Sequence, residues 1–282
     1  MISYLLSLGL TVWTCASPQM VILIMAPWPL LLIPLSSMLK QQPLTKEGYQ
    51  LLPGKENQEE TGGLKYVSSP LALHEKKRIV SLTWHLTISI VVNYFCQYLV
   101  MKSIITTRAF KASHILPRDH FQWYSLAYRG SKFLGRSYLA IFMFCPCSGL
   151  QDWLRTDMVE IFAILGLLQL LVFLLDSLLH FIPSIGILIF LCLLQGFCGG
   201  AIYSNAGCAV FRMLGGQPKQ NIEFALGLVV SGTSVGVLAA GFAGLIVEPY
   251  IKNHCLHVLK LGQYCFTRPM NASSWTHNIH CN

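Results

Sequence analysis

Apolar runs about as long as a membrane-crossing helix recur along this chain and constrain its fold more than any other feature. A helix needs about 20 predominantly apolar residues to cross the apolar core of a bilayer. The runs cover residues 20–39, 79–101, 120–144, 159–179, 185–211 and 223–247. Since a helix satisfies its backbone hydrogen bonds within one segment, these runs predict an all-α, polytopic helical membrane protein.

The composition supports a lipid bilayer as the surroundings of the chain. Of the 282 residues, 54% are hydrophobic and 11% are charged, whereas about 25% are charged in a typical soluble domain. The net charge is +8, but the basic residues lie mostly in the segments beside the runs, as membrane topology requires. No basic and aromatic patch stands apart from them. We therefore expect no nucleic-acid partner.

The runs and the polar segments between them divide the chain into four parts. Residues 1–39 hold about two membrane helices, and residues 40–78 form a long polar segment rich in Lys. Basic loops stay in the cytosol, and a segment with few large apolar residues cannot form a core, so we expect a disordered cytosolic loop. Residues 79–250 then form a bundle of about five membrane helices. Five spans place the tail, residues 251–282, on the lumenal side.

The polar loop contains a peptide that fits two kinds of sorting signal. Glu47 precedes Leu51 and Leu52 at the spacing of an acidic dileucine signal, and Tyr49 with Leu52 fits a tyrosine-based signal. Clathrin adaptors that sort cargo to endosomes and lysosomes bind such peptides in extended form. The overlap of the two patterns in one exposed loop predicts clathrin adaptors as partners.

The tail carries features of a lumenal segment. Asn271 opens the sequence Asn-Ala-Ser, a glycosylation acceptor when it faces the lumen. Three cysteines are then free to pair and leave one unpaired, namely Cys255, Cys265 and Cys281. Nearer the membrane, Cys145 and Cys147 lack the further ligands that a metal site needs. We expect neither a metal nor a cofactor.

The run at residues 120–144 carries cations on one helical face. Steps of three and four residues align Asp119, Gln122, Ser125, Arg129, Lys132 and Arg136. A cation in lipid costs about 2.5–3.5 kcal/mol on insertion scales, so this face is expected to turn toward a polar cavity. The alternative is that long side chains such as Arg129 reach the headgroups.

Other polar residues within the runs complete a candidate site. Asn93 and Gln97 lie one turn apart on one face. Asp176 lies in the run at residues 159–179 and offers itself as an ion-pair partner for Arg136. The other role open to Arg136 is to bind the phosphate or carboxylate of a small anionic solute.

Small residues at every fourth position mark the last two runs as packing helices. One stripe contains Gly196 and Gly200, and the other contains Gly232, Gly236 and Gly244. Such stripes let helix backbones approach closely. The stretch at residues 232–236 also matches the pattern G-x-S-x-G of hydrolases, but that pattern needs a strand-turn-helix context. We expect packing here and no enzyme.

Short stretches that match a known family recur in order along the chain, at residues 122–124, 128, 136–137, 172–176, 181–185, 199–205 and 223–225. Through them, residues 17–251 resemble the battenin family of lysosomal membrane proteins. It implies the C-terminal half of a major-facilitator-type transporter, with residues 1–39 as a remnant of the N-terminal half. Where the family has a glutamate in the span after the long loop, this chain has Gln97. The tail after residue 251 has no counterpart in the family.

The resemblance implies a function as well as a fold. It implies residence in lysosomes and late endosomes, export of glycerophosphodiesters, and support of lysosomal pH and autophagy. In this interpretation Arg136 binds the anion, and neutral hydrogen bonds come from Asn93, Gln97, Tyr203 and Asn205. The alternatives are a non-transporting scaffold whose long loop recruits trafficking partners, or an inactive truncated form.

Overall fold

The described part of the chain is mainly helical and contains no strand. The computed structural model describes residues 9–10, 16–27, 71–111, 117–143 and 159–267. These belong to two compact units. The first contains α2 (Pro18–Met25), which begins where the Ser17 hydroxyl accepts a hydrogen bond from the Met20 amide. The second, Leu71–Pro269, contains the long helices.

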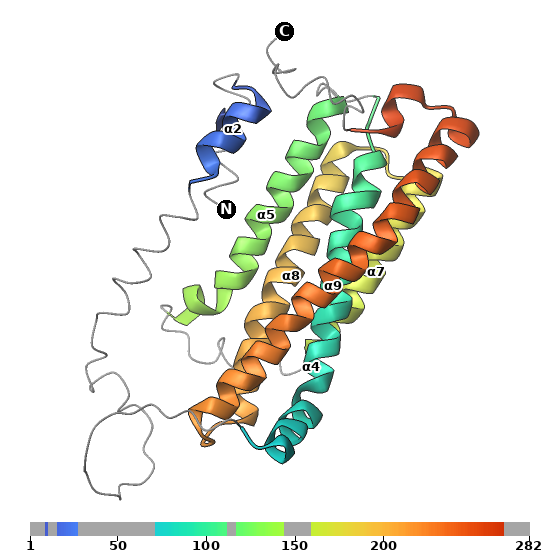
Figure 1. The fold of residues 1–282 in the computed structure, drawn as a ribbon. Helices are drawn as coiled ribbons and strands as arrows, with labels where there is room; N and C mark the ends of the chain where they lie inside the picture. The colour runs from blue at the N-terminus through green and yellow to red at the C-terminus, as the bar shows by residue number, and fades with distance from the viewer. Residues whose placement is uncertain (1–8, 11–15, 28–70, 112–116, 144–158, 268–282) are drawn as a thin grey trace, which may run out of the picture. The chain divides into compact units, whose positions relative to one another are not determined.

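Five long helices make up most of the described part of the second unit, and successive helices run in opposite directions (Figure 1). They are α4 (Leu73–Leu99), α5 (Pro117–Met143), α7 (Val159–Leu179), α8 (Ile185–Met213) and α9 (Lys219–His254). Short helical segments close one end of the unit: η2 (Val100–Ile104) and η3 (Ile105–Thr107) after α4, and η4 (Cys255–Leu259) and η5 (Gly262–Cys265) after α9. We call this end the η3 end.

The helices extend beyond the apolar runs of the sequence. α4 begins at Leu73, so the last residues of the expected polar loop are helical, and Arg78 pairs there with Glu75 at 3.7 Å. α9 continues to His254 and passes through Pro249. Four of the five helices are long and apolar enough to cross a membrane, and these are α4, α7, α8 and α9. α5 has 27 residues but carries the row of cations, so a fifth span stays a prediction.

Packing in the second unit follows two tight pairs, α5 with α8 and α4 with α9, and α7 packs on α4 and α8. A Cβ atom at Gly200 of α8 would lie 2.7 Å from the Arg136 amide nitrogen of α5, and Gly196 makes an equally close approach to Tyr128. On α9, a Cβ at Gly232 would lie 3.1 Å from the Thr87 carbonyl oxygen. Gly236 approaches the backbone of α4 in the same way, and Gly244 lies against the Ser103 side chain of η2. Both expected stripes therefore lie where two backbones come together.

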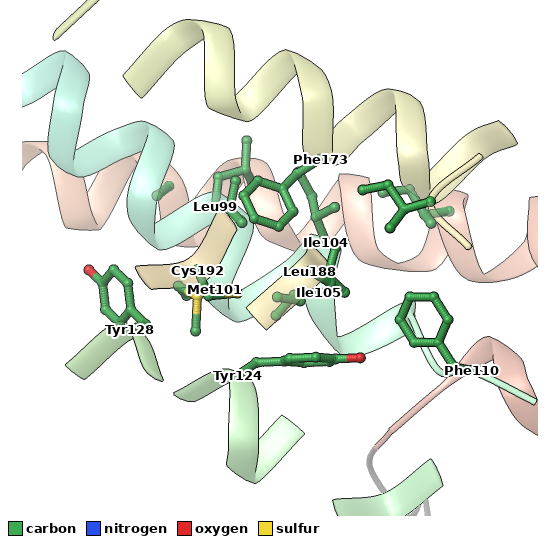
Figure 2. Close-up of a cluster of buried hydrophobic side chains, with 14 residues drawn as sticks. Leu99, Met101, Ile104, Ile105, Phe110, Tyr124, Tyr128, Phe173, Leu188 and Cys192 are labelled. Carbon is green, nitrogen blue, oxygen red and sulfur yellow. The ribbon is translucent and has the colours of Figure 1, made fainter. Parts of the chain in front are cut away.

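A cluster of buried apolar side chains fills the unit near the η3 end (Figure 2). Tyr124 and Tyr128 enter it from α5, Leu188 and Cys192 from α8, and Phe173 from α7. Such a cluster holds the polar face of α5 at a set position against its neighbours.

Candidate functional site

A cavity of about 510 Å³ opens among four helices of the second unit. Arg136 of α5 lines it, together with Tyr203 of α8 and Tyr94 and Tyr98 of α4. The α9 wall consists of Val230, Thr233, Ser234, Val237 and Leu238. Its lining is therefore rich in hydroxyl groups and contains one guanidinium.

Tyrosine side chains hold Arg136 in the cavity. Its Nη2 donates a hydrogen bond of 3.1 Å to the Tyr94 hydroxyl, and its guanidinium carbon lies 4.7 Å from the centre of the Tyr203 ring. Both partners are neutral, and the Arg136 side chain is exposed to the cavity. These contacts leave other N–H groups of the planar guanidinium available for a ligand.

Tyr94 and Tyr98 form the part of the cavity lining that we call the tyrosine wall. Lys132 lies one turn before Arg136 and behind this wall. Its Nζ is 4.4 Å from the ring centre of Tyr94, 5.4 Å from that of Tyr98 and 5.2 Å from that of Tyr128. The same ammonium donates to the Tyr128 hydroxyl at 2.9 Å and to Gln97 Oε1 at 3.2 Å. Within the described residues, neither Lys132 nor Arg136 has a carboxylate partner.

Asn93 and Gln97 belong to a buried hydrogen-bond network rather than to the cavity lining. Gln97 Oε1 accepts from the Tyr128 hydroxyl at 2.8 Å, and Gln97 Nε2 donates to Asn93 Oδ1. Asn93 Nδ2 donates in turn to the Phe162 carbonyl of α7 at 2.6 Å. Both amides are fully buried. Gln97 contacts Lys132 directly, and Asn93 contacts it through Gln97. The two amides therefore act on the cavity through Lys132 and do not line it.

Of the five residues predicted to bind solute, the cavity thus contains Arg136 and Tyr203. Asn205 is also absent from its lining, because its Nδ2 donates to the Tyr138 hydroxyl at 2.5 Å and to the Ala201 carbonyl at 3.0 Å. Sequence reasoning missed Tyr94 and Tyr98. Their spacing of four residues, one turn of helix, was the available signal.

The expected ion pair between Arg136 and Asp176 is wrong. Asp176 pairs with Arg108, whose Nε lies 2.8 Å from Asp176 Oδ2. Arg108 directly follows η3, and the last turn of α7 brings Asp176 to the same end of the unit. Arg136 lies toward the middle of the bundle, where it meets tyrosines instead.

Some of the other predicted features lie within the described residues, and the rest lie outside them. Cys255 and Cys265 form a disulfide at the η3 end, and Cys281 lies outside the described part. The sorting peptide with Glu47, Tyr49, Leu51 and Leu52 and the sequon at Asn271 also lie outside it. Ser234 of the G-x-S-x-G stretch sits in the continuous helix α9, without a strand before it.

Comparison with known proteins assigns the chain to one family. The family model described as CLN3 protein matches residues 8–254. Curated relatives include Protein BTN1 of Eremothecium gossypii, 30% identical over 52% of this chain, and Battenin of Canis lupus familiaris, 25% identical over 65%. Protein btn1 of Schizosaccharomyces pombe is 29% identical over 55% of the chain.

The matched regions cover 31%, 39% and 36% of those three relatives, so the chain spans well under half of their length. No solved structure matches the chain.

Proposed function

This chain belongs to the CLN3 protein family, and we propose that it forms part of a membrane transporter that exports small anionic solutes, such as glycerophosphodiesters, from lysosomes. The observation that carries the proposal is the pair of cations, Lys132 and Arg136, at a tyrosine-lined cavity without a carboxylate partner among the described residues.

The chemistry of the cavity favours an anion that also carries hydroxyl groups. A cation inside a membrane protein is costly unless it meets an anion or strong acceptors. A guanidinium donates two parallel hydrogen bonds to a phosphate or carboxylate. The hydroxyls of Tyr94, Tyr203 and Ser234 lie around it and can bond the polar remainder of the solute.

Several features support a lysosomal setting with the η3 end in the lumen. The disulfide between Cys255 and Cys265 is typical of an oxidising compartment. The sorting peptide with Leu51 and Leu52 supports recruitment of clathrin adaptors from the cytosol, and a lumenal tail makes Asn271 a glycosylation site. Through solute export we propose that the protein supports lysosomal pH homeostasis and autophagy.

Solute uptake by purified protein in liposomes tests the proposal. We expect uptake of radiolabelled glycerophosphoglycerol above that of empty liposomes. Arg136→Lys is expected to reduce it about tenfold or more, since a hydrogen bond to a charged group contributes about 1.5–3 kcal/mol. Arg129→Lys is the matched control, because Arg129 lies on the same helix but outside the cavity lining. Equal uptake by protein-containing and empty liposomes would contradict the proposal.

A further inference from the structure

The network behind the cavity wall has a defined direction. The Phe162 carbonyl can only accept, so the amide of Asn93 must present its Nδ2 to it. Asn93 Oδ1 therefore faces Gln97 and accepts from Nε2, and the opposite end of the Gln97 amide, Oε1, faces Lys132. A main-chain carbonyl on α7 thus sets the orientation of an acceptor for a cation on α5.

Two glycines make room for this network. A Cβ atom at Gly166 of α7 would lie 2.9 Å from Asn93 Nδ2, and one at Gly199 of α8 would collide with the Gln97 amide. The side chains of Asn93 and Gln97 are fully buried and enclosed by neighbouring helices. Neither lines the cavity, so neither is placed to touch a solute there.

The acceptors that hold Lys132 are all neutral. Gln97 Oε1, the Tyr128 hydroxyl and three tyrosine ring faces surround the ammonium. Such partners set its position without cancelling its charge. The Tyr94 ring that lies under Lys132 carries the hydroxyl that bonds Arg136, so one side chain of the cavity wall contacts both cations.

We infer that Asn93 and Gln97 are positioning residues, which hold the Lys132 ammonium behind the tyrosine wall with its charge uncompensated, so that it attracts the same anion as Arg136. The inference rests on the proposed function. The neutrality of the side chain at position 97 is its essential element. A carboxylate there would pair with Lys132 and remove the second cation from the field in the cavity.

The test measures the affinity of the purified full chain for glycerophosphoglycerol by equilibrium dialysis, with the melting temperature as a check on folding. Gln97→Glu keeps the shape and the acceptor oxygen but adds a negative charge. We expect it to weaken binding about tenfold or more, because Coulomb interactions at a few ångströms in a protein are worth several kcal/mol before screening. Gln97→Met removes the acceptor but leaves the charge of Lys132, so it is expected to weaken binding less.

Two further variants complete the test. Lys132→Gln removes the cation itself and is expected to weaken binding as Gln97→Glu does, which keeps the inference testable if the Gln97→Glu variant fails to fold. Gln217→Glu, in the turn between α8 and α9, adds the same charge elsewhere and is expected to bind as the unaltered chain does.

The outcomes separate the inference from the proposed function. If the unaltered chain does not bind the phosphodiester, the proposed function fails. A second outcome is that the unaltered chain binds the phosphodiester and the Arg136→Leu variant does not. If Lys132→Gln or a folded Gln97→Glu variant then binds as tightly as the unaltered chain, only the inference is overturned. Equal losses from Gln97→Met and Gln97→Glu at unchanged melting temperature would also overturn it, because charge would then play no part.

Discussion

Arg108 and Asp176 form a buried ion pair that ties the residue after η3 to the connection between α7 and α8. Arg108 Nη2 also donates to the Ile182 carbonyl at 2.9 Å, and Asp176 Oδ1 accepts from the Ile182 amide at 2.9 Å. The two side chains are 6% and 2% exposed. Both Asp176 oxygens and the Nε and Nη2 atoms of Arg108 thus have hydrogen-bond partners, and such hydrogen bonding is the condition under which a buried pair persists.

Breaking this pair is expected to destabilise the protein strongly. Arg108→Leu leaves the Asp176 carboxylate buried without its cation, which typically costs about 3–5 kcal/mol. Arg78→Leu is the control, because the pair with Glu75 is exposed and is worth about 0–1 kcal/mol. Chemical or thermal unfolding in detergent measures both. Equal effects of the two changes would show that the buried pair does not hold the η3 end together.

Acid is expected to weaken the same region through His180. Burial and the nearby Arg108 cation lower the pKa of its imidazole to about 4, and His254 acts in the same direction, while Asp176 opposes them. An unfolded histidine has a pKa near 6.5. Between about pH 4 and pH 6.5 this histidine is therefore protonated in the unfolded chain but neutral in the folded chain. Its contribution to the free energy of unfolding is complete above about pH 6.5 and is lost as the pH drops toward about 4.

Replacing His180 is expected to remove this part of the acid sensitivity. His180 has φ of 52°, and Asn tolerates that region well, so His180→Asn is the suitable change. Melting temperatures are measured from pH 7 to pH 4, with His257→Asn at an exposed position of η4 as the control. An unchanged pH dependence in His180→Asn would rule out this histidine as the cause.

Close packing of α5 on α8 is expected to depend on Gly200. In Gly200→Ala the new Cβ would meet the backbone of α5 beside Arg136, and overpacking of this kind costs about 1–3 kcal/mol. Gly207→Ala on the same helix is the control, because nothing lies within 4 Å of its Cβ position. The melting temperature and solute affinity are expected to fall only in the first variant. Similar behaviour of both variants would contradict the packing role.

The sorting peptide is expected to decide where the protein resides. Leu51→Ala with Leu52→Ala removes the hydrophobic pair that adaptors bind, so we expect the protein at the cell surface. Microscopy and surface labelling measure the change. Leu71→Ala with Leu73→Ala, at the start of α4, serves as the control. Unchanged lysosomal residence of the first variant would refute the sorting role.

Local sequence patterns were enough to predict the class of the protein and the helices of its second unit. Apolar length is a local property, because each helix satisfies its own backbone hydrogen bonds, and so α7 and α8 were predicted nearly to the residue. The glycine stripes were readable for a similar reason, since only small residues at every fourth position permit close backbone contact. Arg136 was predicted to line a cavity because a cation in an apolar run needs polar groups or water around it.

Which polar groups meet one another depends on the packing of whole helices. Asp176 was expected to pair with Arg136 but pairs with Arg108. The amides of Asn93 and Gln97 were expected to face a solute, but they are buried behind the tyrosine wall, where Gln97 accepts a hydrogen bond from Lys132. Helical periodicity gives the face on which a side chain lies. Its partner on another helix depends on the rotation, crossing angle and relative height of the two helices, which the packing of many side chain volumes sets together.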